Sequence, residues 1–449
     1  MTLAYNTGGR ATAVARFVEQ CRQTLGTDAA ATGDATAAFA IDGQRPAVVC
    51  YPSHINQLRL CVEAAADADL AVVAVGNGTQ LGIGRSPLRY DVAVCTRRMR
   101  RVVAHEAADM TVTVEAGATL DELNQSLAAA GQFLPFDPPR SVDVTIGALI
   151  ATDGSGPLRL EYGKVRDLLI GVHAVLADGT IVKGGGRVVK NVAGYDLMKL
   201  LTGSHGSLAI IAEATFKVCP LPEVEQVFVV AAEGIDPAVT LGARMLAAQL
   251  RPAFVEAVNE GVGRSFELPG AAVVVGFHGS RREIAAQRTE LETIAGNARI
   301  EALDSDASAL LLGRLRDVPA LPGSAGCKVV TSPTRLPSTL RHIAFEASSR
   351  SIEVAIVAHV GSGVAVVRCP IERASSGAFA DFARWLRGEV CAEGGTVIFD
   401  ALPAVLKDRI DPWSTERTIT SGQLSLMRGI KAALDPHRLL SPGRFVGGL

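Results

Sequence analysis

The sequence has few aromatic residues and almost no net charge. Phe, Trp and Tyr make up 5% of 449 residues, and 44 Lys and Arg stand against 46 Asp and Glu. A shortage of aromatic rings disfavours platforms that stack nucleic-acid bases. A net charge of -2 disfavours nucleic acid or an anionic membrane surface as the main partner. We therefore expect no nucleic-acid partner.

Long apolar runs are also missing. No uninterrupted apolar stretch is long enough to cross a bilayer, so we expect no transmembrane segment. The first ten residues contain no basic segment followed by an apolar one, which predicts no signal peptide. These two absences favour a cytoplasmic protein.

The eight cysteines never form a C-x-x-C pair. This spacing gives no support to a zinc ribbon, a ferredoxin-type cluster or a thioredoxin-type redox pair. Most of them stand among Val, Leu or Ala, so we interpret them as small core residues in a reduced compartment. We expect no metal. The cysteines are Cys21, Cys50, Cys61, Cys95, Cys219, Cys327, Cys369 and Cys391.

The length predicts two or three domains of ordinary size. A helix and a loop rich in Ala, Asp, Gly and Thr come first, and Pro220 and Pro222 mark a later boundary. We divide the chain into segments 1–45, 46–222, 223–405 and 406–449.

A glycine-rich loop at residues 76–84 follows an apolar strand expected at 70–75. Glycines at such a place let backbone N–H groups approach a phosphate closely. A Rossmann loop needs G-x-G-x-x-G before a helix, but Gly82 comes one residue too late and another strand follows. The loop indicates a phosphate cradle of another kind, with an ordinary glycine-rich turn as the alternative. A helix capped by Ser53 and a hairpin turning at Asp178-Gly179 are expected nearby.

The region from about 224 to 403 repeats one pattern. Both of its halves predict the order strand, helix, strand, strand, helix, strand, which is a split βαβ unit occurring twice. Such a repeat favours one antiparallel sheet with its helices on one face. The expected strands are 226–231, 254–258, 272–277, 299–303, 327–332, 352–359, 363–369 and 396–401.

Several short motifs together resemble one family of flavoproteins. In chain order they are residues 76–79, 114–117, 135–139, 145–147, 162–167, 178–179, 190–196 and 441–444. The chain resembles FAD-dependent enzymes of the vanillyl-alcohol oxidase and p-cresol methylhydroxylase type, and within them the FAD-binding E subunit of bacterial glycolate oxidase. Residues 105–115 and 190–196 are the most specific matches. The resemblance implies an α+β fold, with a two-part FAD-binding domain at 46–222, a cap domain at 223–405 and a C-terminal segment returning to the flavin.

The resemblance also implies residue roles. The first loop would hold the FAD pyrophosphate through the backbone of Gly76, Asn77, Gly78, Thr79, Gln80 and Leu81. The remaining cofactor-binding residues would be Pro138, Thr145, Gly147, Gly154, Gly156, Asn191, Tyr195, Ile211 and Arg444. The candidates for catalysis are Tyr195, Arg444, Lys190 and Arg368.

The FAD is expected to be held without a covalent bond. Relatives with covalent flavin carry a histidine in the first loop, where this chain has Thr79. A threonine hydroxyl is too weak a nucleophile to replace it without an adjacent base. No histidine stands between His54 and His105, and no cysteine between Cys95 and Cys219.

The implied reaction is oxidation of a small 2-hydroxy acid such as glycolate. Without a cysteine motif for an iron–sulfur cluster, the electrons would leave through partners, namely an iron–sulfur subunit and a second flavoprotein subunit. Those partners leave open a peripheral attachment to the inner membrane. A sugar or aldonolactone oxidase is a remoter alternative.

One cap motif departs from the family pattern. Catalytic members carry an H-x-G-D-G-N-x-H stretch, but here His359 is followed by Ser362 in place of the acid, and by no second histidine. This departure keeps a second function open: a non-catalytic flavin-binding assembly subunit, or an electron relay, beside a catalytic sister flavoprotein.

Overall fold

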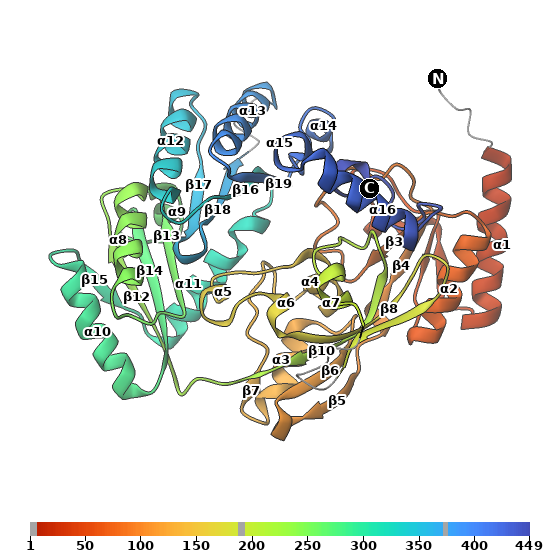
Figure 1. Ribbon diagram of the computed structural model, residues 1–449, viewed down its shortest axis with the longest axis horizontal. Helices are drawn as coiled ribbons and strands as arrows, with labels where there is room; N and C mark the ends of the chain where they lie inside the picture. Colours follow the sequence, from red (N-terminus) through yellow and green to blue (C-terminus); the bar gives the residue numbers. More distant parts are fainter. Residues whose placement is uncertain (1–6, 187–193, 371–375) are drawn as a thin grey trace.

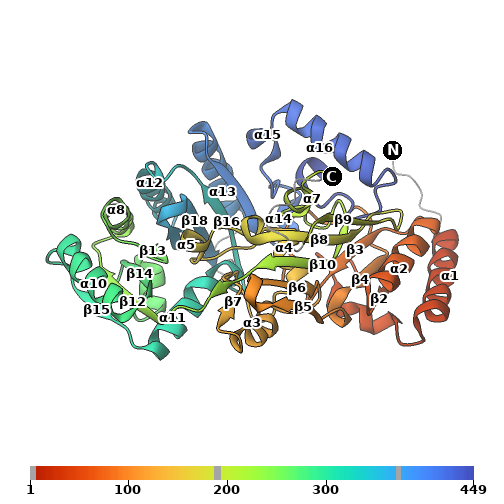
Figure 2. The same cartoon turned by 60° about the horizontal axis from the view of Figure 1, so that its bottom comes forward.

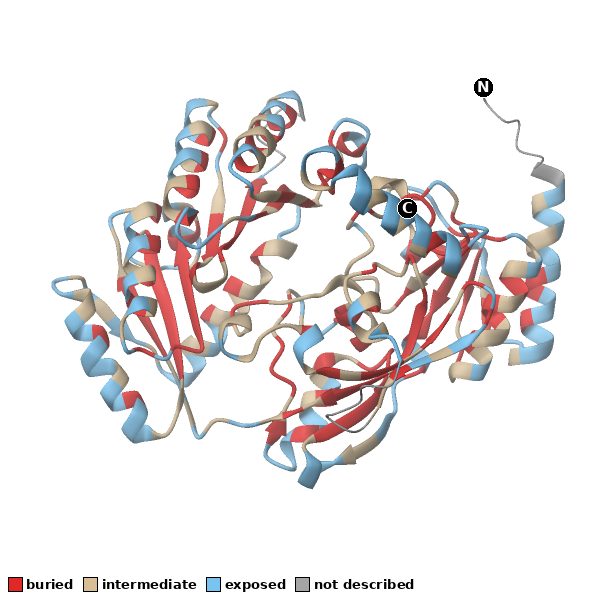
Figure 3. Cartoon of the chain, viewed as in Figure 1, coloured by how far each residue is buried: buried red, intermediate tan, exposed pale blue. Residues whose placement is uncertain are grey.

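The computed structural model describes residues 7–186, 194–370 and 376–449. Figure 1 shows two lobes, with the first half of the chain and its C-terminal segment in one lobe and the cap in the other. Figure 3 shows that the strands of both lobes are largely buried. The α+β fold expected from the sequence is confirmed.

A small sheet begins the first lobe. Its order is β1-β2-β4-β3, with β2, β3 and β4 parallel and β1 antiparallel to β2. The helices α1 and α2 cover one face through a shared apolar cluster that includes Phe17, Leu58 and Val62. The bounds are α1 Thr7–Leu25, β1 Ala30–Thr32, β2 Val48–Cys50, α2 Ile55–Asp67, β3 Val72–Val75 and β4 Val92–Cys95.

The N-terminus of α2 differs from the expectation. His54 is its N-cap and accepts from the backbone N–H of Gln57, whereas Ser53 donates through its hydroxyl to the Gln57 side chain. The helix therefore begins one residue later than the serine signal predicted.

A five-stranded antiparallel sheet follows, in the order β5-β6-β10-β8-β9. Thr119 caps α3 in a complete capping box with Glu122, which satisfies two backbone N–H groups that would otherwise lack partners. The predicted hairpin is β8 and β9, turning at Gly179 with φ +85°. The bounds are β5 Val102–Glu106, β6 Thr111–Glu115, α3 Leu120–Ala128, α4 Ile146–Thr152, α5 Arg159–Tyr162, α6 Val165–Leu168, β8 Leu169–Val175, β9 Ile181–Gly185, α7 Leu197–Leu201 and β10 Ile210–Lys217.

Two short strands lead toward the cap. They are β7 Gln132–Phe133 and β11 Cys219–Pro220, which pair antiparallel. Ile210 and Ala212 of β10 pack into the same apolar cluster as α1 and α2, so the two sheets of this lobe share a core.

The cap is one antiparallel sheet of eight described strands, in the order β15-β12-β14-β13-β17-β18-β16-β19. Each half has the strand order of a split βαβ unit, and the halves join edge to edge through β13 and β17. The repeat expected from the sequence is confirmed. The strands are β12 Val224–Ala231, β13 Phe254–Val258, β14 Ala272–Gly279, β15 Ile300–Ala302, β16 Ser324–Val330, β17 Ala355–His359, β18 Val364–Pro370 and β19 Thr396–Ala401.

The cap helices do not all lie on one face, which corrects the expectation. Phe228 of β12 faces the cluster with α8, α10, α12 and α13, while its neighbour Val227 faces the cluster with α9 and α11. Figure 2 shows α8, α12 and α13 above this sheet and α11 below it. Both faces of the cap sheet are apolar, so helices must pack on both faces to exclude water. The helices are α8 Ile235–Ala247, α9 Glu260–Ser265, α10 Arg281–Ala295, α11 Ser305–Asp317, α12 Leu336–Ser349 and α13 Ser376–Ala392.

The C-terminal segment returns to the first lobe. It contains α14 Ala404–Lys407, α15 Thr415–Thr418 and α16 Ser421–Leu434. Beyond α16, Val72 of β3 donates to the Leu439 carbonyl at 2.7 Å, and Ser441 donates back to the Val72 carbonyl at 2.8 Å. The segment is thus tied to the strand that leads into the glycine loop.

Candidate functional site

A hollow that is open to solvent, with about 820 Å³ of empty space including its mouth, lies where β3 ends, between the glycine loop, α4, the start of β10 and the C-terminal segment. Its lining residues are Val73, Ala74, Val75, Gly76, Gly78, Thr79, Gln80, Leu81, Ile83, Thr96, Gly147, Ala148, Ala151, Thr152, His205, Gly206, Ala209, Ile210, Ile211, Trp413 and Arg444. Segments far apart in the sequence therefore form one site.

The glycine loop passes directly against the start of α4. A Cβ on Gly76 would lie 2.1 Å from the Thr145 hydroxyl oxygen, so no side chain fits there. Gly78 has φ +78°, in the left-handed region that favours glycine. Thr145 caps α4 by accepting from the Ala148 N–H, which holds the threonine in place. The loop therefore depends on glycine at both positions.

The hydroxyl of Thr79 supplies the test of whether a cofactor fits. Among the described residues it is buried and has no hydrogen-bond partner. Leaving a buried polar group unpaired costs about 1–3 kcal/mol, which a polar ligand in the hollow would recover. Glycines that expose backbone N–H groups beside an unpaired hydroxyl suit the phosphates and ribose hydroxyls of a dinucleotide. The residues present therefore fit FAD.

Arg444 closes the hollow from the C-terminal segment. Its side chain is buried, and Nη2 donates to the carbonyls of Leu81 and Ile83, each at 2.7 Å. Trp413 donates through Nε1 to the Arg444 carbonyl at 2.9 Å. Burial lowers the pKa of this guanidinium. Arg444 therefore fastens the glycine loop to the chain's last segment.

His205 also lines the hollow, although the sequence analysis did not single it out. Its ring meets Trp413 edge-on, with centroids 4.8 Å apart, and lies 5.5 Å from the Phe445 ring. Burial lowers the pKa of His205 to about 3, with the Arg444 charge adding to the effect. The imidazole is therefore neutral at physiological pH. Its position between Gly203 and Gly206, just before β10, was the available signal.

The hollow brings together eight of the residues expected to bind the cofactor. These are Gly76, Gly78, Thr79, Gln80, Leu81, Gly147, Ile211 and Arg444. Thr145 lies behind the loop, and the Asn77 side chain donates away from the hollow to the Asp143 carbonyl at 2.9 Å. The lining residues that were not predicted from the sequence are Val73, Ala74, Val75, Ile83, Thr96, Ala148, Ala151, Thr152, His205, Gly206, Ala209, Ile210 and Trp413.

Other expected site residues lie elsewhere or outside the described chain. Gly154 packs on Pro138, and a Cβ on Gly156 would lie 2.0 Å from the Asp137 carbonyl, so both glycines lie against the 137–138 segment. Pro138, Gly154 and Gly156 do not line the hollow. Tyr195 is 93% exposed. Lys190 and Asn191 lie outside the described residues.

Arg368 and His359 each pair with a carboxylate of the cap. Arg368 is buried in β18, where it donates to Asp400 at 2.8 Å and to the Pro319 carbonyl at 2.9 Å. The His359 Nδ1 lies 2.9 Å from the Glu256 carboxylate, which is itself buried. Neither Arg368 nor His359 lines the hollow.

Burial shifts the pKa of the groups near His359. It raises the pKa of Glu256, and it raises the pKa of Asp137 to about 7. For His359 burial acts downward, but the attraction and hydrogen bond of Glu256 outweigh it and raise the pKa. His359 and Glu256 thus stabilise each other's charge, whereas burial disfavours the charged form of all three groups.

The chain matches two family descriptions. Residues 46–185 match the FAD binding domain, and residues 221–445 match the C-terminal domain of FAD linked oxidases. No described helix is long and apolar enough to cross a membrane.

Three curated proteins show the range of similarity. Glycolate oxidase subunit GlcD of Bacillus subtilis is 26% identical over 425 residues, covering 89% of this chain and 88% of that protein. A probable mitochondrial D-lactate dehydrogenase of Danio rerio is 28% identical over 428 residues, covering 89% and 84%. Glycolate oxidase subunit GlcE of Escherichia coli is 34% identical over 152 residues, covering 34% and 43%.

Solved structures share the fold. p-Cresol methylhydroxylase superposes with a TM-score of 0.79 at 15% identity, covering 96% of each chain. 4-Ethylphenol oxidase from Gulosibacter chungangensis superposes with a TM-score of 0.76 at 17% identity, covering 97% of each. At this identity the likeness concerns the fold alone.

Proposed function

The chain belongs to the FAD-linked oxidases, and from that premise we propose that it oxidises a small 2-hydroxy acid, such as glycolate, with FAD as its cofactor. The observation that carries the proposal is the hollow beside β3, where the unpaired Thr79 hydroxyl stands in a glycine loop. Relatives named for glycolate, D-lactate and D-2-hydroxyglutarate support the substrate class, because all three acids carry a hydroxyl beside a carboxylate.

The FAD is held without a covalent bond in this proposal. The backbone around Gly76 and Gly78 faces the pyrophosphate, the Thr79 hydroxyl pairs with the cofactor, and Ile211 contributes to the apolar wall that excludes water. Bound FAD supplies the two-electron acceptor that alcohol oxidation needs. The segment 46–222 is the FAD-binding domain, 223–405 the cap and 406–449 the closing segment.

The candidates for binding and oxidising the substrate come from separate parts of the chain. Arg444 is the candidate nearest the glycine loop for binding a carboxylate, and Tyr195 and Lys190 stay candidates for proton transfer and for binding. Arg368 is a weaker candidate, because Asp400 and three backbone carbonyls already accept hydrogen bonds from all three nitrogens of its guanidinium.

A second function is favoured by the cap itself. His359 is paired with Glu256, and Ser362 stands where catalytic relatives carry an acid. This arrangement supports a flavin-binding assembly or electron-relay subunit, similar to the E subunit of glycolate oxidase. Its partners would be an iron–sulfur subunit and a catalytic flavoprotein subunit. The 34% identity to the GlcE subunit over 152 residues supports this assignment for part of the chain.

An experiment that adds 2-hydroxy acids to this chain without its partner subunits distinguishes the two functions. The purified, FAD-loaded protein is mixed anaerobically with glycolate, D-lactate or D-2-hydroxyglutarate, and the flavin absorbance is followed. Bleaching of the flavin supports oxidation by this chain. A flavin that bleaches only after the co-expressed partner subunits are added supports the assembly or relay function. A chain that retains no FAD under any condition contradicts both.

A further inference from the structure

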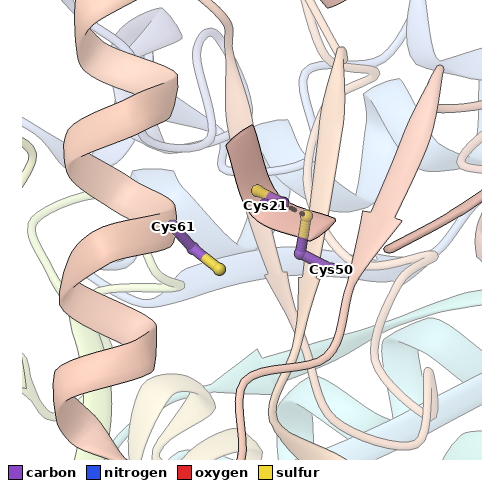
Figure 4. A group of neighbouring side chains, drawn as sticks. All are labelled: Cys21, Cys50 and Cys61. Atoms are coloured by element: carbon purple, nitrogen blue, oxygen red, sulfur yellow. Dashed lines mark hydrogen bonds between the residues drawn. The ribbon is translucent and has the colours of Figure 1, made fainter. Parts of the chain in front are cut away.

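Three cysteines that are distant in the sequence converge in the first lobe. Cys21 comes from α1, Cys50 from β2 and Cys61 from α2, and Figure 4 shows the Cys21 and Cys50 side chains meeting, with Cys61 on the neighbouring helix. Their three sulfur atoms all lie within 4.8 Å of one another, and the Cys21 and Cys50 sulfurs are 3.8 Å apart. The residues are exposed by 1%, 0% and 0%.

The size of this sulfur triangle suits a cation at its centre. Three sulfurs around one cation at about 2.3 Å, the zinc–sulfur distance, stand about 4.0 Å from each other. One pair here is 3.8 Å apart and no pair exceeds 4.8 Å, so modest side-chain rotation closes the site. The sulfurs are too far apart for a disulfide, whose bond is about 2.05 Å.

The chemistry of the three ligand atoms determines which class of cation the group can bind. All three donors are sulfur, which soft cations prefer and which Mg²⁺ and Ca²⁺ do not. The surroundings are apolar, with Phe17, Leu58 and Val62 in the same cluster, and the group contains no fourth ligand among the described residues. A cation that needs four protein ligands is therefore disfavoured.

The charge balance of the group favours a divalent cation. Binding replaces the thiol protons by the cation, because the thiolate and not the thiol is the metal ligand. A divalent cation on three thiolates leaves one negative charge, whereas a monovalent cation leaves two. Because charge in an apolar core is costly, the divalent cation is favoured.

We propose that Cys21, Cys50 and Cys61 form a binding site for one soft, thiophilic divalent cation, held by three thiolates. The site ties α1 to β2 and α2, independently of the FAD hollow. A groove between α1 and α2 has Phe17 and Ala64 in its lining, so local opening of α1 gives a cation access to the cluster.

The test uses the full chain, kept reduced, and Cd²⁺ as the probe. Equilibrium dialysis is expected to give one Cd²⁺ per chain, with a thiolate-to-cadmium ultraviolet band and release of protons from the thiols. Binding is expected to raise the melting temperature. Saturation without that band, or without proton release, overturns the proposal.

Matched alanine variants assign the ligands. Cys50→Ala and Cys61→Ala are expected to weaken Cd²⁺ binding by more than about 100-fold, the upper cost of removing an outer-shell partner. Cys327→Ala, at another buried strand cysteine, is the control and is expected to bind as the unchanged chain does. FAD content checks that each variant folds, and Cys61→Ala serves if Cys50→Ala does not fold. Unchanged affinity in a folded Cys61→Ala variant, or loss of binding in Cys327→Ala, overturns the assignment.

Discussion

The hollow beside β3 and the interior of the cap use polar groups in opposite ways. Of the residues that line the hollow, Arg444 and His205 are the ones with ionisable side chains, and the rest are mainly glycine, alanine, threonine and aliphatic residues. In the cap, Arg368 is paired with Asp400 and His359 with Glu256, all inside the sheet or at its edge. One region leaves its backbone and a hydroxyl available to a ligand, whereas the other uses its charges to hold itself together.

This difference separates binding from stability. Changes in the glycine loop should affect FAD and leave the fold, and changes in the cap pairs should affect the fold and leave FAD. Three experiments test that separation, and a fourth measures how His205, on the opposite wall of the hollow, makes the stability of the fold depend on pH.

Complete release of the flavin by acid is the largest expected effect. If the hollow holds FAD only through backbone groups, hydroxyls and burial, then acid precipitation leaves a colourless pellet and intact FAD in the supernatant. The measurement is the absorbance and chromatographic identity of the released flavin. Colour that stays in the pellet after acid and denaturant contradicts the assignment of Thr79 to the position of the covalent histidine.

Gly76→Val is expected to reduce FAD binding by about tenfold or more, because a misfit of only about 1.4 kcal/mol has that effect. A Cβ there would lie 2.1 Å from the Thr145 hydroxyl oxygen and push the loop away. The measurement is FAD affinity by fluorescence titration of the apoprotein. Gly82→Val is the matched control in the same loop, because its Cβ would meet nothing within 4 Å. Equal FAD affinity in both variants would show that the loop does not hold the cofactor.

Arg368→Met is expected to lower the free energy of unfolding by about 3 kcal/mol, because it removes the partner 2.8 Å from the buried Asp400 and leaves only Lys328, at 3.9 Å, among the described residues. FAD affinity is expected to stay the same. Denaturant unfolding and FAD titration measure the two quantities. Arg384→Met, which removes an exposed pair with Asp381, is the control, and should cost less than about 1 kcal/mol. A stable Arg368→Met chain that no longer oxidises the acid would instead place Arg368 in catalysis.

The last expected effect is a pH dependence from His205. Its pKa is lowered from 6.5 to about 3 in the fold, so between these values the unfolded chain binds more protons and stability falls as the pH falls. From pH 7 to pH 5 the loss from this group is about 2 kcal/mol. His205→Asn, which tolerates the local φ of +51°, should remove that part of the pH dependence. Parallel stability curves for the two proteins would refute the assignment.

Local signals predicted the elements of this fold well. Ser53 marked the start of α2 to within one residue, and Asp178-Gly179 marked a hairpin, because each signal lies close in the sequence to what it controls. The repeated cap was also predictable, since the strand and helix order occurs twice. The face of α11 was not, because its amphipathic pattern does not say which side of the sheet it covers.

The site was predictable only in its contiguous part. The loop from Gly76 to Leu81 lines the hollow as expected, but the opposite wall comes from His205 and Trp413, which carry no local motif. Arg368 looked like a substrate ligand from its position on a cap strand, and only the fold reveals Asp400 beside it. The convergence of Cys21, Cys50 and Cys61 likewise could not be predicted from the sequence, because their spacing resembles no metal motif.

The hydrogen bond from Arg444 to Leu81 spans 363 positions of the chain, and the whole cap is encoded between the two residues. The glycine loop is therefore synthesised long before the segment that fastens it. Closing so long a loop is slow, because its entropy is lost before the contact is gained. On the proposed function, FAD loading is therefore expected late in the life of each molecule, because a nascent chain that has not yet reached Trp413 has the loop and the cap but lacks one wall of the hollow.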